Sequence, residues 1–207
     1  MRKLLLGACV LATVIGAGAA FASRVHVTAT EDATVKISSP TGHGSGVHIG
    51  DGYIITAAHV VDDADSFSVK TRSGSESKAT IILSDSGADV ALLRDDEIAG
   101  TVPAARLSCR TASVGEHVRS IGNPGEFEFI STYGRISGAP REFPPNWRSA
   151  FVVDLTVHTG ASGGPVFDNS NEIVGILVGG VTINSATIGY SFVVPSSEVC
   201  RLMGRGA

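Results

Sequence analysis

A serine lies in a glycine-rich segment whose residue types suit nucleophilic catalysis. Residues 159–165 read TGASGGP, with Ser162 at the centre. A serine hydroxyl is a poor nucleophile at neutral pH until a neighbouring base takes its proton. A serine between glycines can also be part of a simple turn. The hypothesis of a nucleophile therefore depends on whether the chain also supplies a base.

Two other segments supply a candidate base and a carboxylate to orient it. Residues 55–61 read ITAAHVV, so an apolar stretch ends in small residues and His59. Residues 87–93 read GADVALL, and Asp89 opens an apolar run that would draw its carboxylate into the interior. A buried carboxylate is costly unless it is paired, and a histidine N–H is a suitable partner. Together the segments predict a triad of Ser162, His59 and Asp89.

Asp85 is the alternative to Asp89, and it lies only four residues upstream. It stands in a Ser-Asp-Ser sequence that is typical of a turn, whereas Asp89 directly precedes the apolar run, so Asp89 is favoured. The remaining histidines have no such context and are interpreted as surface, turn or structural residues: His26, His43, His48, His117 and His158.

Short strands are expected to position these residues. Hydrophobic residues make up 43% of the chain and charged residues 17%, which excludes a disordered chain and suits a globular one. Apolar runs between turn signals predict two series of about six strands, at 34–37, 46–49, 53–56, 66–70, 79–83 and 90–94, then at 117–121, 128–136, 150–155, 164–167, 173–179 and 189–194. The expected fold is all-β, with two antiparallel barrels that leave no long edge exposed.

The segments also resemble a known family. ITAAHVV, GADVALL and TGASGGP are similar to the signature segments of chymotrypsin-like serine proteases, in that family's order of His, Asp and Ser. The closer resemblance is to the bacterial HtrA/Deg-type proteases and, more distantly, to glutamyl endopeptidases. It is also carried by GSGV at 44–47, by VGE and IGNP within 114–124, and by GYSFVVPS at 189–196. The resemblance spans Ala33 to Met203.

The resemblance implies two six-stranded β-barrels with the active site between them. The expected domains are a signal peptide at 1–22 and a trypsin-like protease domain at 23–207. Within the protease domain we expect an N-terminal barrel at about 31–108, a C-terminal barrel at about 113–194 and a terminal helix at about 196–203.

The resemblance also assigns roles to the candidate residues. His59 would take the proton from Ser162 and later give it to the leaving amine, while Asp89 would hold the imidazole in the correct tautomer. The backbone N–H groups of Gly160 and Ser162 would form the oxyanion hole. Gly160 suits this position because a side chain would resist the unusual backbone turn.

The resemblance also implies which residues line the primary specificity pocket. Thr156 would stand at its base, where trypsin-like enzymes have aspartate, so cleavage after Lys or Arg is not expected. Leu177 and Val157 replace the histidine and the hydroxyl residue of glutamyl endopeptidases, which argues against glutamate. Gly180 and Gly189 would leave the walls open. We expect a small to medium apolar side chain to bind there.

The N-terminus predicts export. MRK is followed by the uncharged, largely apolar residues 4–20, and the small residues of Ala20-Phe21-Ala22 predict cleavage after Ala22. The exported chain would be periplasmic or secreted. The alternative is an uncleaved anchor, since about 17 apolar residues can span a bilayer. A lipid-attachment signal at Cys9 is disfavoured because too few apolar residues precede it.

Two cysteines, Cys109 and Cys200, remain after removal of the signal. In an exported chain they can form a disulfide, which would stabilise the fold by about 4 kcal/mol in the chain-entropy model. Two buried free thiols are the equal alternative.

Several classes of partner are disfavoured. The net charge is -4 and no basic run follows the first three residues, which argues against nucleic-acid binding. The cysteines are too few and too far apart for a metal site, and no His-Glu-x-x-His segment occurs, so no metal or cofactor is expected. The few residues after the terminal helix leave no room for a PDZ domain, so neither PDZ gating nor trimerisation can be inferred. The oligomeric state stays open.

The sequence thus predicts an exported serine endopeptidase that acts on protein or peptide substrates through an acyl-enzyme, without stable membrane association once the signal is cleaved. The first alternative is a catalytically silent protease-fold binding or scaffold protein. The second, a non-peptidase hydrolase of the α/β class, is disfavoured because there the carboxylate and the histidine follow the serine, whereas here both precede it.

Overall fold

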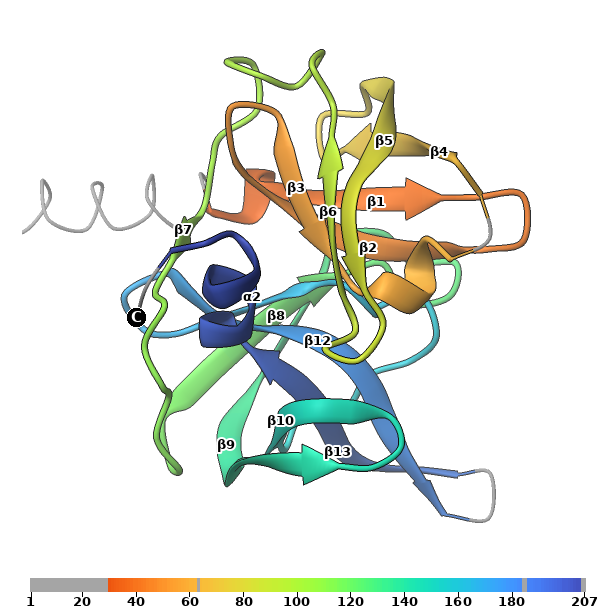
Figure 1. Ribbon diagram of the computed structural model, residues 1–207. Coiled ribbons are helices and arrows are strands. Elements are labelled where there is room, and N and C mark those ends of the chain that lie inside the picture. The colour runs from red at the N-terminus through yellow and green to blue at the C-terminus, as the bar shows by residue number, and fades with distance from the viewer. Residues whose placement is uncertain (1–29, 63, 184–185, 206–207) are drawn as a thin grey trace, which may run out of the picture.

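Strands dominate the computed structural model, which describes residues 30–62, 64–183 and 186–205 (Figure 1). The predicted signal peptide at 1–22, with its cleavage site and the alternative anchor, lies outside the described residues. Within those ranges, no helix is both long enough and apolar enough to cross a membrane.

The first six strands close into an antiparallel barrel in the order β1-β2-β3-β6-β5-β4. Alternation of side chains builds its core: in β4, Phe67, Val69 and Thr71 are buried while Ser66 and Ser68 are exposed. The strands are β1 (Thr34–Ser38), β2 (His43–Gly50), β3 (Tyr53–Thr56), β4 (Ser66–Thr71), β5 (Glu76–Asp85) and β6 (Val90–Arg94).

The second group of strands runs in the order β11-β8-β9-β10-β13-β12, and β11 also pairs with β12, so these six strands close on themselves. A two-residue strand, β7 (Arg106–Leu107), adds to β12 in parallel and was not predicted. The six are β8 (His117–Gly122), β9 (Ile130–Phe143), β10 (Trp147–Val153), β11 (Pro165–Phe167), β12 (Glu172–Ile183) and β13 (Ala186–Pro195).

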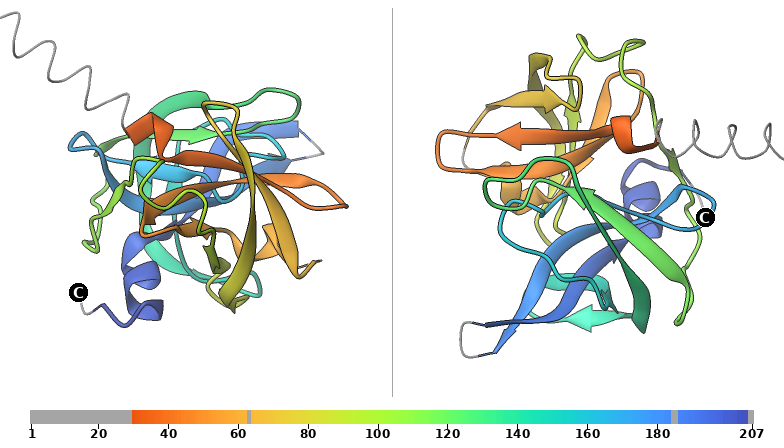
Figure 2. Two further views of the ribbon diagram at one scale, coloured as in Figure 1. Left: turned by 90° about the horizontal axis from the view of Figure 1, so that it is seen from above. Right: turned by 180° about the vertical axis from the view of Figure 1, so that it is seen from behind.

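The two barrels pack against each other through a shared apolar core. Val47 and Ile55 of the first barrel and Ile121 and Ile176 of the second belong to one buried cluster. Val199 of the terminal helix α2 (Ser196–Leu202) joins the same cluster. Viewed from behind in Figure 2, the orange and yellow first barrel lies above the green and blue second barrel. The prediction of an all-β fold with two six-stranded barrels and a short terminal helix is confirmed.

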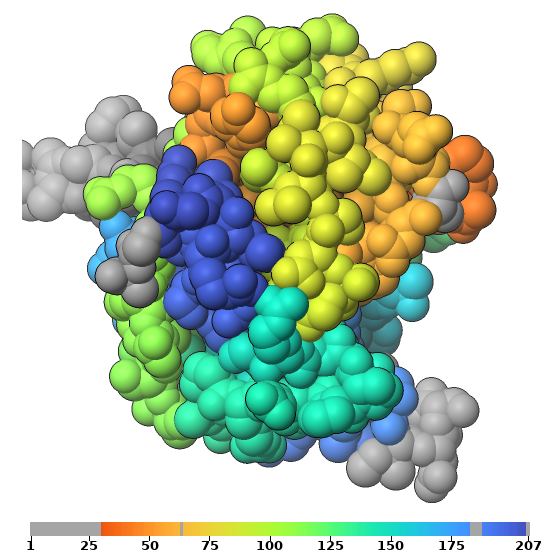
Figure 3. All heavy atoms as spheres, viewed as in Figure 1, coloured from red at the N-terminus to blue at the C-terminus, as the bar shows by residue number. Residues whose placement is uncertain are grey.

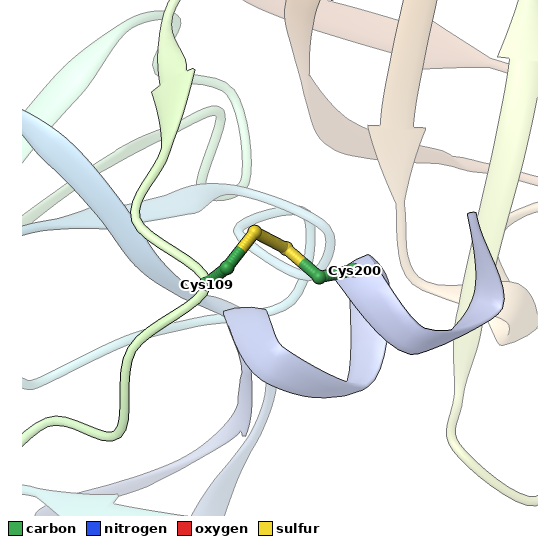
Figure 4. Close-up of a disulfide and its surroundings, with 2 residues drawn as sticks. All are labelled: Cys109 and Cys200. Carbon is green, nitrogen blue, oxygen red and sulfur yellow. A yellow bond between two sulfur atoms is a disulfide. The ribbon is translucent and has the colours of Figure 1, made fainter. Parts of the chain in front are cut away.

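Cys109 and Cys200 form a disulfide between the inter-barrel connection and α2 (Figure 4). Their Cα atoms lie 5.8 Å apart, within the usual range for a disulfide. The sequence left free thiols as an equal alternative, whereas the structure has the bridge. It ties together residues 91 positions apart.

We expect the double substitution Cys109→Ala/Cys200→Ala to lower the free energy of unfolding by about 2 to 4 kcal/mol, because it releases a long loop in the unfolded chain. Urea unfolding of the protein, with and without reductant, measures this. The reduced wild type should approach the variant, and the variant should not respond to reductant. Equal stability of oxidised wild type and variant would contradict the expectation.

Candidate active site

His59 and Asp89 meet because their strands are neighbours. The 3-10 turn η1 (Ala58–Val60) follows β3, Asp89 directly precedes β6, and β3 pairs with β6. His59 Nδ1 lies 2.9 Å from both carboxylate oxygens of Asp89. A carboxylate only accepts hydrogen bonds, so Nδ1 donates, and in the neutral ring Nε2 then carries a free lone pair. The His59 side chain is 45% exposed and that of Asp89 only 10%, so the base is accessible while its partner is shielded.

Asp89 is held by more than the imidazole. The backbone N–H of His59 donates to Oδ1 at 3.1 Å, and the indole N–H of Trp147 donates to Oδ2 at 3.0 Å. Asp89 itself has a φ of 54°, a left-handed conformation that is uncommon for a residue other than glycine. Trp147 was not among the predicted site residues. The one signal in the sequence was that it is the single tryptophan.

The electrostatics of the pair favour a charged Asp89. Burial acts to raise the pKa of Asp89, but the hydrogen bonds and the charge of His59, with a contribution from Trp147, outweigh it, and the pKa is lowered. The pKa of His59 is raised, first by its hydrogen bond to Asp89, while burial opposes the rise. The negative charges of Asp89 and Asp62 add to it. The site therefore holds a carboxylate beside a base that keeps its proton to a higher pH than free histidine does.

The alternative carboxylate, Asp85, has different partners. It accepts hydrogen bonds from the guanidinium of Arg148 at 3.0 Å and from the backbone N–H of Ala88 at 3.0 Å. No hydrogen bond or ion pair joins Asp85 to His59 in the described part of the chain.

Ser162 lies in the loop before β11, and this loop contacts both barrels. Ser45 of β2 donates its backbone N–H to Ser162 O at 2.7 Å, and Gly163 donates to Leu177 O of β12 at 2.7 Å. Gly163 has a φ of 84°, and a Cβ there would overlap Ser45 O and Thr56 Oγ1. The loop is thus fixed at the barrel junction.

Ser162 and His59 line the same pocket of about 400 Å³. Among the described residues, no hydrogen bond joins Ser162 Oγ to His59. In unliganded enzymes this bond is often long and forms only when substrate binds. The arrangement suits a nucleophile and a base on one cavity.

The backbone at Gly160 is built for a left-handed turn. Its φ is 95°, and a Cβ would overlap Asn123 O and the His43 ring. The N–H groups of Gly160 and Ser162 donate to no acceptor within the described ranges, so both are available to a ligand.

A buried polar network holds Gly160 in place. Ser45 Oγ donates to Gly160 O at 2.8 Å and accepts the backbone N–H of Asn123 at 2.9 Å. His43 Nε2 donates to Asn123 O at 2.9 Å, and its ring packs on Gly160. Ser45 and Asn123 are fully buried. Sequence reasoning noted their segments, GSGV and IGNP, but assigned them no role in the site, and it interpreted His43 as a surface or turn residue.

Only some of the predicted pocket residues line the pocket that contains Ser162. Val157, Leu177 and Gly180 do, together with His59, His158, Thr159, Gly179 and Thr182. Thr156 lies instead on an adjoining cavity of about 720 Å³, which extends to the segment from Pro124 to Phe127. A Cβ on Gly189 would lie 3.7 Å from Thr156 Oγ1, so these two predicted residues face each other.

The described residues contain no group of three His, Cys, Asp or Glu side chains arranged to hold a metal ion.

Comparison with protein families and curated proteins gives matches. The model of a trypsin-like peptidase domain matches residues 44–176. A probable periplasmic serine endoprotease DegP-like from Pseudomonas savastanoi pv. phaseolicola is 39% identical over 155 residues, covering 73% of this chain and 32% of that protein. The protein of the same description from Halomonas elongata is 37% identical with the same coverage. The chain thus spans about a third of the length of these relatives.

Solved structures give the same picture over most of the chain. The serine endoprotease from Yersinia pestis has 29% identity and a TM-score of 0.72, covering 86% of this chain and 64% of that chain. The Rv3671c protease of M. tuberculosis, in an inactive form, has 27% identity and a TM-score of 0.73, covering 91% of this chain and 96% of that chain.

We expect the pKa of His59 to lie above its ordinary value of 6.5 and to fall in Asp89→Asn, because the substitution removes the charge that stabilises the imidazolium. NMR titration of the histidine ring protons measures both. Asp85→Asn is the matched control, four residues away, and should leave the pKa of His59 unchanged. A His59 titration that is the same with and without the Asp89 carboxylate would contradict the assignment.

Proposed function

Because the chain belongs to the trypsin-like peptidase family, we propose that it is a serine endopeptidase that hydrolyses peptide bonds in proteins. The observation that carries the proposal is that His59, which is hydrogen-bonded to Asp89, lines one pocket with Ser162. Its relatives of similar sequence are described as serine endoproteases.

The proposed reaction has two stages. Ser162 Oγ attacks the substrate carbonyl carbon while His59 Nε2 takes the hydroxyl proton, and His59 then gives this proton to the leaving amine as the C–N bond breaks. Water then attacks the acyl-enzyme with His59 again as the base, which releases the acid and restores Ser162. Asp89 accepts the Nδ1–H throughout and stabilises the charged imidazolium.

The negative charge on the carbonyl oxygen needs donors that are already in place. The backbone N–H groups of Gly160 and Ser162 serve as the oxyanion hole in this proposal, and each such donor is typically worth about 3 to 4 kcal/mol of transition-state stabilisation. The contact of Ser45 with Gly160 O supports the role, because it anchors Gly160 through its carbonyl, while the Gly160 N–H, which belongs to the preceding peptide group, donates to no acceptor among the described residues.

The proposed substrate side chain is small to medium and apolar. Val157 and Leu177 are buried beside Ser162 and offer apolar surface, and Gly180 adds no side chain that would narrow the pocket. His158, Thr159 and Thr182 add polar groups to the same lining. Size selection by such a pocket is worth about 1 to 3 kcal/mol per methylene group.

The proposal includes export. A charged start and the apolar residues 4–20 support a signal cleaved after Ala22, which would leave residues 23–207 in the periplasm or the medium. The periplasmic description of the relatives supports this location, as does a disulfide, which persists in oxidising compartments.

A catalytically silent protease-fold protein is the second candidate. The observation that favours it is that Ser162 Oγ and His59 form no hydrogen bond within the described part of the chain. In that case the pocket would bind a protein segment without cleaving it.

A fluorophosphonate probe distinguishes the two candidates. We expect it to label the wild-type protein at Ser162, and Ser162→Ala to lose both the label and casein hydrolysis while keeping its circular dichroism spectrum. Ser170→Ala, at an exposed serine in the turn after β11, is the matched control and should keep both. A folded wild-type protein that takes no label would reject the peptidase and leave the binding protein.

Cleavage of a peptide library by the purified protein tests the pocket. We expect cuts mainly after small to medium apolar residues. Gly180→Val should reduce cleavage after leucine about tenfold more than cleavage after alanine, because it narrows the pocket. A preference for acidic or basic residues would contradict the assignment.

A further inference from the structure

Trp147 makes a contact that links the two barrels at the triad. It is the first residue of β10 in the second barrel, whereas Asp89 precedes β6 in the first. The indole N–H donates to Asp89 Oδ2 at 3.0 Å. The carboxylate is therefore held from the barrel that does not carry it.

The indole also faces the wall of the pocket that contains Ser162. A Cβ on Gly179 would lie 3.5 Å from Cη2 and Cζ2 of the Trp147 ring, an ordinary van der Waals distance. Gly179 lines that pocket. The Trp147 ring also packs against the ring of Phe192, with the two centroids 4.7 Å apart, and Phe192 packs in turn against Phe143. The ring position is thus set by packing in the second barrel.

The residue after Trp147 fixes the start of β10 to the Asp85–Asp89 segment. The backbone N–H of Arg148 donates to Gly87 O at 2.8 Å, and its guanidinium binds Asp85 through two hydrogen bonds of 3.0 Å. In Figure 3 the yellow atoms of the first barrel and the teal atoms of the β9–β10 hairpin meet beside the blue helix α2. The approach of Trp147 to Asp89 is part of this wider contact.

The terminal torsion of an aspartate is broad, so one donor alone does not define the carboxylate plane. Here the backbone N–H of His59 binds Oδ1, while Trp147 binds Oδ2. Two donors on separate oxygens fix the plane, and with it the direction in which Nδ1 of His59 must point.

We propose that Trp147 is a positioning residue for the triad, holding the Asp89 carboxylate so that His59 keeps its Nε2 toward Ser162. The proposal rests on the function proposed above. The indole N–H also draws charge from the carboxylate, so its loss should leave Asp89 more attractive to the imidazolium. Besides Asp89, the charge of Asp62 acts on His59 among the residues that the structure describes.

The first test does not need activity. Trp147 is the single tryptophan, so a ¹⁵N-labelled protein has one indole N–H signal. We expect this signal to move upfield in Asp89→Asn, which weakens the hydrogen bond, and to stay in place in Asp85→Asn. It should also shift as His59 titrates. An indole signal that does not respond to Asp89→Asn would overturn the proposal.

The second test removes the N–H and keeps the ring. Replacing Trp147 with 3-benzothienylalanine puts sulfur in place of the N–H at nearly the same volume. We expect kcat to fall about tenfold, as for the loss of one hydrogen bond to a charged group, with KM nearly unchanged. The acidic limb of the kcat/KM profile should move to higher pH, because His59 then holds its proton more tightly.

Phe192→Leu is the control for packing alone. It removes part of the ring packing but keeps the N–H and its hydrogen bond to Asp89, so it should leave the acidic limb in place. A benzothienyl variant with the kcat and acidic limb of the wild type would overturn the positioning role. If the wild-type protein takes no fluorophosphonate label, the proposed function fails. Two measurements then still decide the positioning role. One is the response of the Trp147 indole signal to Asp89→Asn, and the other is the pKa of His59 in the benzothienyl variant, which should be higher than in the wild type.

Discussion

The buried carboxylate of Asp89 is the constraint on which the rest of this site depends. A carboxylate that is taken out of water must be paired and hydrogen-bonded, or it takes up a proton and becomes neutral. The donors here come from His59 in the first barrel and Trp147 in the second. Because donors from both barrels bind the carboxylate, the charge of Asp89 and the docking of the barrels stabilise each other.

The loop that carries Ser162 depends on both barrels in the same way. Its backbone is held by Ser45 from β2 and by Leu177 from β12, while Ser45 and Asn123 together fix Gly160. These partners are buried, so an unmade hydrogen bond among them would cost about 1 to 3 kcal/mol. The unusual turn at Gly160 is therefore maintained by the surrounding core, together with the hydrogen bond from Ala161 N–H to His158 O within the loop.

The comparisons show that the two-barrel fold is shared with other proteases. The trypsin-like peptidase match spans residues 44–176, and solved proteases superpose over most of the chain at below 30% identity. Such a frame constrains where the loops meet. In this chain, Trp147 at the start of β10 is the residue of the second barrel that donates a hydrogen bond to the Asp89 carboxylate.

The sequence by itself determined the residue types that are candidates for a triad, and it determined the strand content. Nucleophilic chemistry needs a serine, a base and a carboxylate in recognisable local segments, and apolar runs between turns identify strands within those same few residues. Only the tertiary structure decided the contacts of Trp147, the Ser45–Asn123 network, the separation of Thr156 from the pocket of Ser162 and the choice between disulfide and thiols. Each joins residues distant in the chain or depends on how loops pack, and a local pattern carries no information about which distant groups the closing barrels bring together.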